Sequence, residues 1–336
     1  MKTYRDSRGY PYLHLPSVTQ TAGNRIDGNG REWHGGKAQV IIRDKTWKRK
    51  DLYPVVDTPS RLYIIDSLDD KLFQDAVDTL FASSIIGFSS EGQMVGREGV
   101  LSWIVFSDER DVFMFDIVKL GKAAFRFGLR SILQSNDVLK IVHNSQQICD
   151  CLFHQWNTRM ENVIDTMAAD LVFCSHNVYG RFIPKYYRSL PRLLIDYLGV
   201  GDSHIFYPRY RRTHLAEDSA VWTTRPLPDH LVLGAARNCL YLLPLHRQIE
   251  VGNMLSVNLA TSILLSSLRD KDEPEANRVN LDLLPEEFHS ILPDRRNDPS
   301  TKRLKIQDNI FVHQNISNSD PLCIFSKDCM HQSQVL

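Results

Sequence analysis

The sequence predicts an α/β fold in which a mixed β-sheet is flanked by helices. Across residues 61–265, short apolar runs typical of strands alternate with segments in which apolar residues recur at helical spacing. Two strand-like runs, Leu101–Phe106 and Val112–Phe115, are separated by the turn sequence SDERD. The stretch Ile85–Gly92 (IIGFSSEG) has the pattern of a buried strand that ends in a tight turn closed by glycine. In an α/β sheet, strand ends of this kind are where functional sites lie.

The other elements follow in chain order. A strand at Ile64–Ser67 precedes a helix over Asp69–Phe81, in which Leu72, Phe73 and Ala76 share one face. The pattern then predicts strands at Val138–Val142 and Val163–Asp165, and helices at Phe125–Leu133, Ser145–Trp156, Thr166–Cys174, Leu190–Leu198 and Pro228–Val251.

Length and composition limit the organisation. At 336 residues, either one large core with extensions or two domains would fit. We expect a basic N-terminal extension over residues 1–60, either a partial Sm-like domain or a disordered arm. The main domain would cover residues 61–255, and a polar, partly disordered region residues 256–336. Lys plus Arg equals Asp plus Glu, 40 each, so any electrostatic site must be a local patch.

The chain shows no sign of a membrane protein or of a disulfide scaffold. No apolar run approaches the ~18 residues that span a bilayer, and the N-terminus has no apolar signal core. The six cysteines are scattered without a CxxC pair, which indicates reduced thiols in the cytoplasm.

Five motifs along the chain carry a family resemblance. In order they are IIGFSSEG, KIVHNSQQICDCLFHQ, IDTMAADL, WTTRPLP and LGAARNCLYLLPL. Together they resemble the DEDD superfamily of 3′–5′ exonucleases, RNase D branch, over about residues 61–251, which implies an RNase H-like fold. The chain is similar in particular to the exonuclease 3′–5′ domain-containing group of the piRNA pathway. That resemblance implies a homodimeric RNA adapter with a degenerate nuclease site, acting beside PIWI and Tudor-domain proteins in the cytoplasm or in germline granules.

The resemblance also identifies the positions that would hold metal ions. Such nucleases bind two divalent cations about 4 Å apart through carboxylates. The corresponding positions here are Ser89, Glu91, Ile148 and Asn238, and the family's tyrosine position is Gly234. Only Glu91 keeps a carboxylate. We therefore predict an inactive exonuclease-like protein with no catalytic residue, no metal and no cofactor.

Four residues at or near these positions have other expected roles. Asp150 lies two residues beyond Ile148, roughly 200° around a helix, so we expect it to point away from the site as an exposed residue. Asp165 is expected to cap the helix that begins at Thr166. We expect His143 to be a satisfied turn histidine and Glu91 to accept a hydrogen bond from a neighbouring backbone N–H.

A basic, tyrosine-containing stretch is the candidate RNA-binding segment. Residues 181–212 carry seven Lys/Arg against two acids, with tyrosines beside and among them. Cations neutralise phosphates and aromatic rings stack on unpaired bases. The predicted RNA-binding residues are Arg181, Lys185, Arg188, Arg209, Tyr210, Arg211 and Arg212. The alternative is a helix pair with a solvated basic face and core tyrosines, and Tyr197 is expected in the core. The run Lys45–Lys50 around Trp47 is a weaker candidate.

The sequence thus predicts a protein that binds single-stranded RNA without cleaving it. Two alternatives stay open. One is an active, metal-dependent 3′–5′ exoribonuclease that uses displaced acids such as Asp150 and Asp165. The other is a protein-interaction scaffold that does not bind RNA.

Overall fold

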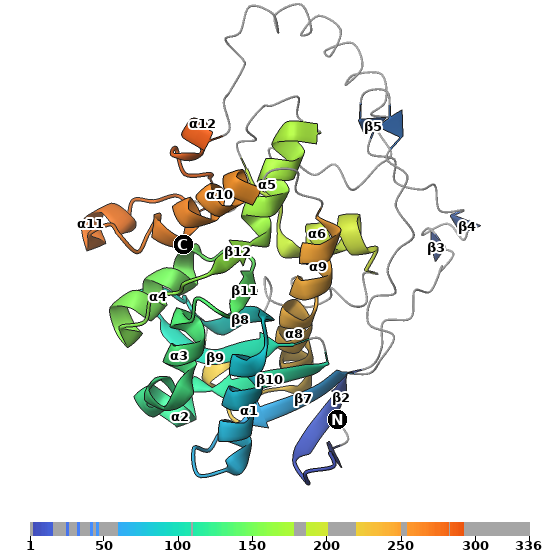
Figure 1. Cartoon of the computed structure of the whole chain (residues 1–336), viewed down its shortest axis with the longest axis vertical. Helices are drawn as coiled ribbons and strands as arrows, with labels where there is room; N and C mark the ends of the chain where they lie inside the picture. The colour runs from blue at the N-terminus through green and yellow to red at the C-terminus, as the bar shows by residue number, and fades with distance from the viewer. Residues whose placement is uncertain are drawn as a thin grey trace, which may run out of the picture. The chain divides into compact units, whose positions relative to one another are not determined.

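An eight-stranded mixed sheet organises the chain (Figure 1). Its strand order is β1-β2-β7-β10-β9-β8-β11-β12. The pairs β7–β10, β8–β11 and β11–β12 are parallel, and the other neighbouring pairs are antiparallel. The strands are β1 (Thr3–Arg5), β2 (Pro11–Leu15), β7 (Ser60–Ile65), β8 (Ile85–Gln93), β9 (Val100–Ser107), β10 (Asp111–Asp116), β11 (Leu139–Val142) and β12 (Val163–Asp165). The predicted mixed sheet is confirmed.

The structure is a computed structural model that describes residues 3–15, 25–26, 32–33, 41–42, 45–46, 60–108, 110–177, 186–200, 220–249, 254–281 and 283–291. These residues all belong to one unit, Met1–Leu292. Two short antiparallel ladders join β3 (Arg25–Ile26) to β4 (Glu32–Trp33), and β5 (Ile41–Ile42) to β6 (Lys45–Thr46).

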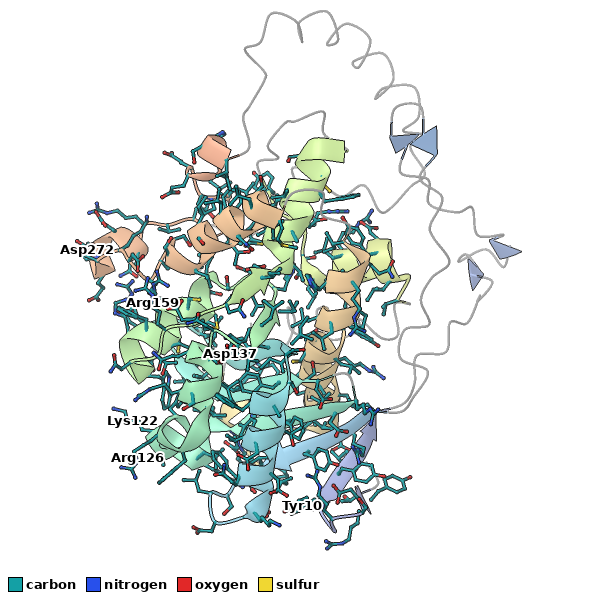
Figure 2. The ribbon with its side chains drawn as sticks, in the orientation of Figure 1. Tyr10, Lys122, Arg126, Asp137, Arg159 and Asp272 are labelled. Carbon is teal, nitrogen blue, oxygen red and sulfur yellow. The ribbon has the colours of Figure 1, made fainter. Side chains whose placement is uncertain are left out.

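The hairpin β1–β2 extends the sheet at the edge beside β7. The Tyr10 hydroxyl donates a hydrogen bond to Asp75 on α1 at 2.9 Å, and the Tyr63 hydroxyl donates to Asp6 at 3.0 Å (Figure 2). Part of the predicted extension over residues 1–60 therefore pairs with the main sheet. The boundary at residue 60 itself stays a prediction.

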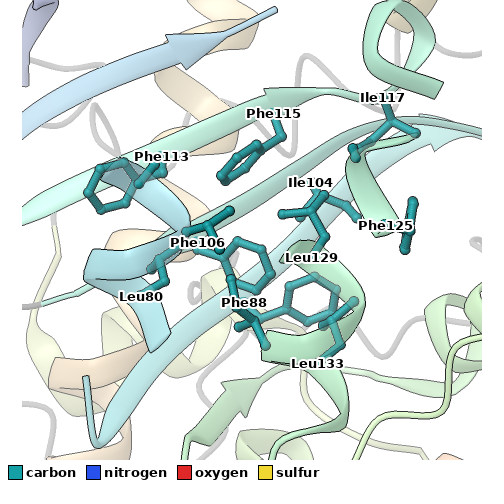
Figure 3. Close-up of a cluster of buried hydrophobic side chains, with 14 of the residues drawn as sticks. Leu80, Phe88, Ile104, Phe106, Phe113, Phe115, Ile117, Phe125, Leu129 and Leu133 are labelled. Carbon is teal, nitrogen blue, oxygen red and sulfur yellow. The ribbon is translucent and has the colours of Figure 1, made fainter. Parts of the chain in front are cut away.

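The two faces of the sheet bury different side chains because successive residues of a strand point in opposite directions. On β10, Phe113 and Phe115 join one apolar cluster, and Val112 and Met114 join another. Figure 3 shows the first cluster, where Phe113 and Phe115 lie near Phe106 and Leu80. Its helices are α1 (Lys71–Ala82), α2 (Ile117–Ala124), η1 (Phe125–Leu129), α3 (Arg130–Gln134) and α4 (Gln146–Trp156). Each fully buried phenylalanine contributes roughly 1.5–3 kcal/mol.

The second cluster lies under the helix that carries Asn238. Trp222, on the 3₁₀ turn η3 (Val221–Thr223), is fully buried there against side chains of α8 (Asp229–Leu240). A third cluster surrounds the β11–β12 edge. Its helical segments are α5 (Thr166–Asn177), α6 (Leu190–Leu193), η2 (Leu194–Leu198), α9 (Leu242–Gln248), α10 (Met254–Ser266) and α12 (Phe288–Ile291).

Helix α10 belongs to the same core as the sheet. Val257, Ala260 and Leu264 are buried in the third cluster, and the Thr261 hydroxyl accepts a hydrogen bond from the Asp165 backbone N–H at 3.1 Å. Residues beyond 255 therefore support the sheet edge, although the domain boundary predicted there stays a prediction. The short helix α11 (Glu273–Ala276) follows α10.

Two predicted elements differ from the structure. The helix predicted over Pro228–Val251 is divided into α8 and α9 at Tyr241. Pro244 explains the break because it has no N–H for residue 240 and its ring clashes with that residue's carbonyl. The predicted turn at Ser89–Gly92 is also wrong. Strand β8 continues to Gln93 because β9 pairs with it along its length, with a bulge at Glu91/Gly92.

Candidate functional site

A pocket of about 540 Å³ lies where β8, the N-terminal part of α4 and the junction of α8 with α9 meet. Its polar lining consists of Ser89, Ser90, Glu91, His143, Asn144, Gln147, Tyr187, Ser189 and Asn238. Its apolar lining consists of Phe88, Val95, Val142, Ile148, Leu190, Pro191 and Leu242. Of the described residues around this pocket, one is acidic and none is a lysine or arginine.

The pocket gathers the metal-ligand positions that the motifs predicted. Ser89 and Glu91 come from β8, Ile148 from α4 and Asn238 from α8, and all four line the pocket. Gly234 is buried one helical turn before Asn238 on α8 and is not among the described lining residues. The structure therefore places these four side chains around one cavity, with Glu91 as their single carboxylate.

Close approach of α8 to β8 sets the position of Asn238. A Cβ at Gly87 would lie 2.8 Å from the Cys239 backbone oxygen, so only glycine lets the helix come this close. The Asn238 Nδ2 donates a hydrogen bond to Glu91 Oε1 at 3.4 Å. Glu91 is 2 % exposed. This donor is a side-chain amide at the neighbouring ligand position, and the backbone N–H donor expected for Glu91 stays a prediction.

The turn after β11 is held by Asp165. Its carboxylate accepts hydrogen bonds from Asn144 N at 3.0 Å, Ser145 N and Ser145 Oγ both at 2.8 Å, and Met167 N at 2.9 Å. The bond from Met167 N confirms the predicted helix-capping role. Asp165 therefore fixes the backbone that carries His143 and Asn144 into the pocket wall.

His143 lies in this wall and has a hydrogen-bond partner. Its Nδ1 is 3.0 Å from the Thr166 hydroxyl oxygen, which confirms a satisfied turn histidine. Desolvation lowers the pKa of the His143 imidazole, against the opposing effect of the negative charges of Asp165 and Asp170. A neutral imidazole at physiological pH follows from that direction.

Asp150 is buried, so the prediction of an exposed residue is wrong. Asp150 lies on the side of α4 away from the pocket. There Arg97 donates two hydrogen bonds to the Asp150 carboxylate, from its backbone N and from its Nη2, both at 2.7 Å. Arg97 Nη2 also donates to the Leu268 and Lys271 carbonyls, and these bonds tie the β8–β9 loop to the segment after α10. Asp150 does point away from the pocket, as predicted, because it is two residues beyond Ile148.

Arg188 lies in a dense polar cluster next to the pocket. Its guanidinium donates to Asp170 and, at 2.8 Å, to Asp196, and it lies 5.5 Å from the centroid of the Tyr197 ring. Burial alone would lower the pKa of the Arg188 guanidinium, but hydrogen bonding to Asp170 and the charge of that carboxylate raise it. Tyr197 is buried, as predicted, and donates to Asp170 at 2.8 Å. These contacts favour a structural role for Arg188, and its contact with RNA stays untested.

The other predicted RNA-binding residues, Arg181, Lys185, Arg209, Tyr210, Arg211 and Arg212, lie outside the described residues, as does Trp47. Sequence reasoning missed Asn144, Gln147 and Tyr187, which line the pocket. The signal for Asn144 and Gln147 was their place on either side of the start of α4, directly after the strand that ends at Val142.

Comparison with known proteins identifies the family. A sequence model described as 3′–5′ exonuclease matches residues 65–252. The chain belongs to this 3′–5′ exonuclease family. The match covers β8, α4 and α8, which carry the four predicted ligand positions.

Relatives of this chain include proteins called piRNA biogenesis protein EXD1. The Mus musculus protein is 35% identical over 182 residues, which cover 54% of this chain and 32% of that protein. The Bombyx mori protein is 28% identical over 235 residues, which cover 69% of this chain and 71% of that protein. The chain thus spans only about a third of the mouse relative.

The solved structure of Trypanosoma brucei RNase D in complex with RNA U12 shares the fold, with a TM-score of 0.55 at 18% identity. The superposition covers 69% of this chain and 79% of that chain. The family and fold that the motifs suggested are therefore confirmed.

Among the described residues, no group of three or more His, Cys, Asp or Glu lies together as metal ligands would. None of the helices among these same residues is long and apolar enough to cross a membrane.

Proposed function

We propose that this exonuclease-family protein binds single-stranded RNA without cleaving it. The observation that carries the proposal is the composition of the pocket. Four family ligand positions meet there, and Ser89, Ile148 and Asn238 bring no negative charge. Phosphodiester cleavage in this family depends on two metal ions. Whether the lining residues can hold those ions therefore decides between RNA binding and RNA cleavage.

The donor set does not fit a pair of divalent cations. Mg²⁺ and Mn²⁺ prefer hard, charged oxygen ligands, and Glu91 alone would face two dications. Ile148 presents hydrocarbon where a ligand oxygen is required, and the Asn238 amide already donates a hydrogen bond to Glu91.

The acids that could replace the missing ligands are engaged elsewhere. Asp165 accepts hydrogen bonds from the turn after β11, and Asp150 forms an ion pair with Arg97 at 2.7 Å. Moving either side chain into the pocket would leave buried donors without acceptors, at a cost of about 1–3 kcal/mol for each group. This cost argues against an active enzyme built on displaced acids.

The wider role is proposed from resemblance. Relatives named for piRNA biogenesis support an adapter role in piRNA processing. In that role the protein would act as a cytoplasmic homodimer beside PIWI and Tudor-domain proteins. The RNA-contacting residues would be the basic stretch with Arg181, Lys185, Arg209, Tyr210, Arg211 and Arg212.

One assay separates the candidate functions. A 5′-labelled single-stranded RNA is incubated with the full chain in Mg²⁺, in Mn²⁺ or in EDTA, and both retention and shortening are measured. We expect retention that changes less than about twofold between metal and EDTA and weakens with salt, without shortening. Glutamate at Arg209, Arg211 and Arg212 together should weaken retention by about tenfold or more.

The other outcomes contradict the proposal in different ways. Metal-dependent shortening that disappears in Glu91→Gln would identify an active exonuclease. A folded protein that neither retains nor shortens the RNA would support the remaining candidate, a protein-interaction scaffold that does not bind RNA.

A further inference from the structure

The described lining residues of the pocket include no lysine or arginine that could pair with the phosphates of a bound RNA. Several cations elsewhere in the described chain are paired with acids. Arg61 pairs with Asp111 at 2.6 Å, and Arg97 is held by Asp150. A surface for phosphate should instead carry exposed cations without a carboxylate beside them.

Such cations occur on the segment that covers the first apolar cluster. Residues 117–136 contain Lys119, Lys122, Arg126 and Arg130 and no acidic residue. Lys119 is taken by Asp66 at 2.5 Å, and Arg130 donates to the Trp156 carbonyl at 3.0 Å. Lys122 and Arg126 are exposed and have no carboxylate partner in the described part of the chain.

These two cations lie on one side of the segment. They are four residues apart, about one helical turn or ~6 Å along the axis. Figure 2 shows Lys122 and Arg126 projecting next to each other from the same side of the molecule. That separation suits neighbouring phosphates on one extended strand.

An exposed aromatic ring lies beside them. Phe127 is 52 % exposed, and the Arg126 guanidinium lies 4.8 Å from the centroid of its ring. A flat ring next to a guanidinium offers stacking surfaces for an unpaired base.

The backbone explains why Phe127 faces outward. Phe125 and Leu129 fill the core, and the π-turn η1 places Gly128 against α1. A Cβ at Gly128 would lie 2.5 Å from Val77 Cγ1, so η1 is in tight contact with α1 at the residue next to Phe127. A π-turn inside a helical segment commonly marks a functional position.

We propose that Lys122, Arg126 and Phe127, here called the α2 face, bind single-stranded RNA. The two cations contact successive phosphates, and the ring stacks on a base. This proposal rests on the proposed RNA binding and adds a surface that neither the nuclease pocket nor the basic stretch at 181–212 includes. Charge complementarity favours a polyanion, and the exposed ring favours one with unpaired bases.

The test measures the affinity of the full chain for a labelled oligouridylate by fluorescence anisotropy over a range of salt concentrations. Lys122→Glu with Arg126→Glu should weaken binding by about tenfold or more. The slope of log K against log salt should fall in magnitude by roughly 1.4, which corresponds to two lost phosphate contacts. Phe127→Ala alone should weaken binding by about fivefold or more and leave the slope unchanged.

The matched control makes the same charge change elsewhere. Lys71→Glu with Arg278→Glu replaces two exposed cations that have no carboxylate partner among the described residues and do not belong to the α2 face. This control should bind within about twofold of the parent protein. Thermal unfolding of each variant verifies that the fold is retained.

Three outcomes would overturn the proposal. Equal affinity for RNA in the Lys122/Arg126 variant and the control would show that the α2 face does not bind RNA, and the proposed RNA binding by the protein would still stand. No RNA binding by the parent protein would overturn both proposals. Unchanged RNA affinity together with lost flotation on phosphatidylserine vesicles would make the face a membrane-contacting surface instead.

Discussion

Replacing Arg188 with alanine is expected to lower the free energy of unfolding by about 3–5 kcal/mol. The Asp170 side chain is only 3% exposed, and Arg188 supplies its counter-charge. The same guanidinium also pairs with Asp196, whose side chain is 19% exposed. Without Arg188, the buried carboxylate of Asp170 keeps the hydrogen bond from the Tyr197 hydroxyl but loses this counter-charge. Urea denaturation of the variant measures the loss.

Two further variants make this prediction specific. Adding Asp170→Asn to Arg188→Ala should recover a large part of the stability because the buried charge is removed. Arg192→Ala is the matched control, since Arg192 is 47% exposed and pairs with Asp196 only, so its loss should cost under about 1 kcal/mol. An Arg188→Ala protein of parental stability that has lost RNA affinity would instead support the RNA-binding role that the sequence predicted.

Replacing Asp165 with alanine should lower the free energy of unfolding by about 3 kcal/mol or more. Asp165 is fully buried and accepts hydrogen bonds from Asn144, Ser145 and Met167. Its removal leaves those donors buried without an acceptor and frees the turn that forms one wall of the pocket. Denaturant unfolding reports the stability, and hydrogen exchange of the Asn144 and Ser145 amides reports the turn.

The control for Asp165 is an acid on the surface. Asp137→Ala changes an exposed carboxylate and should stay within about 0.5 kcal/mol of the parent protein. A stable Asp165→Ala protein that has lost a metal-dependent activity would contradict the capping role and make Asp165 a ligand.

The sequence predicted the sheet core because its signals are local. Strands β9 and β10 and the helices around Leu72 and Leu152 follow apolar periodicity, which depends on residues close together in the chain. The family resemblance identified Ser89, Glu91, Ile148 and Asn238 as the ligand positions, and the structure brings these four residues together around one pocket.

What the sequence could not give depends on contacts between distant segments. The continuation of β8 through Glu91 is decided by its pairing with β9, and the pattern SSEG alone suggested a turn. The burial of Asp150 depends on Arg97, 53 residues away in sequence. In the sequence alone, Arg188 has the features of a surface cation. In the structure it pairs with Asp170 and Asp196, which lie on the helical segments before and after it in the chain.

The exposed cations of the α2 face show a different limit. The absence of acids between residues 117 and 136 was visible in the sequence. Which of the four cations is free, however, depended on Asp66 and on the Trp156 carbonyl, both remote in sequence. The net charge of a segment is therefore a weaker guide to a phosphate-binding surface than the charge that remains after ion pairing.

We infer that the pocket has too little negative charge to hold two divalent cations. Crystals of the full chain soaked in Mn²⁺, with anomalous diffraction recorded, test it most directly. We expect no pair of manganese peaks between Glu91 and Asn238. Two manganese ions about 4 Å apart and bound by Glu91 would contradict it.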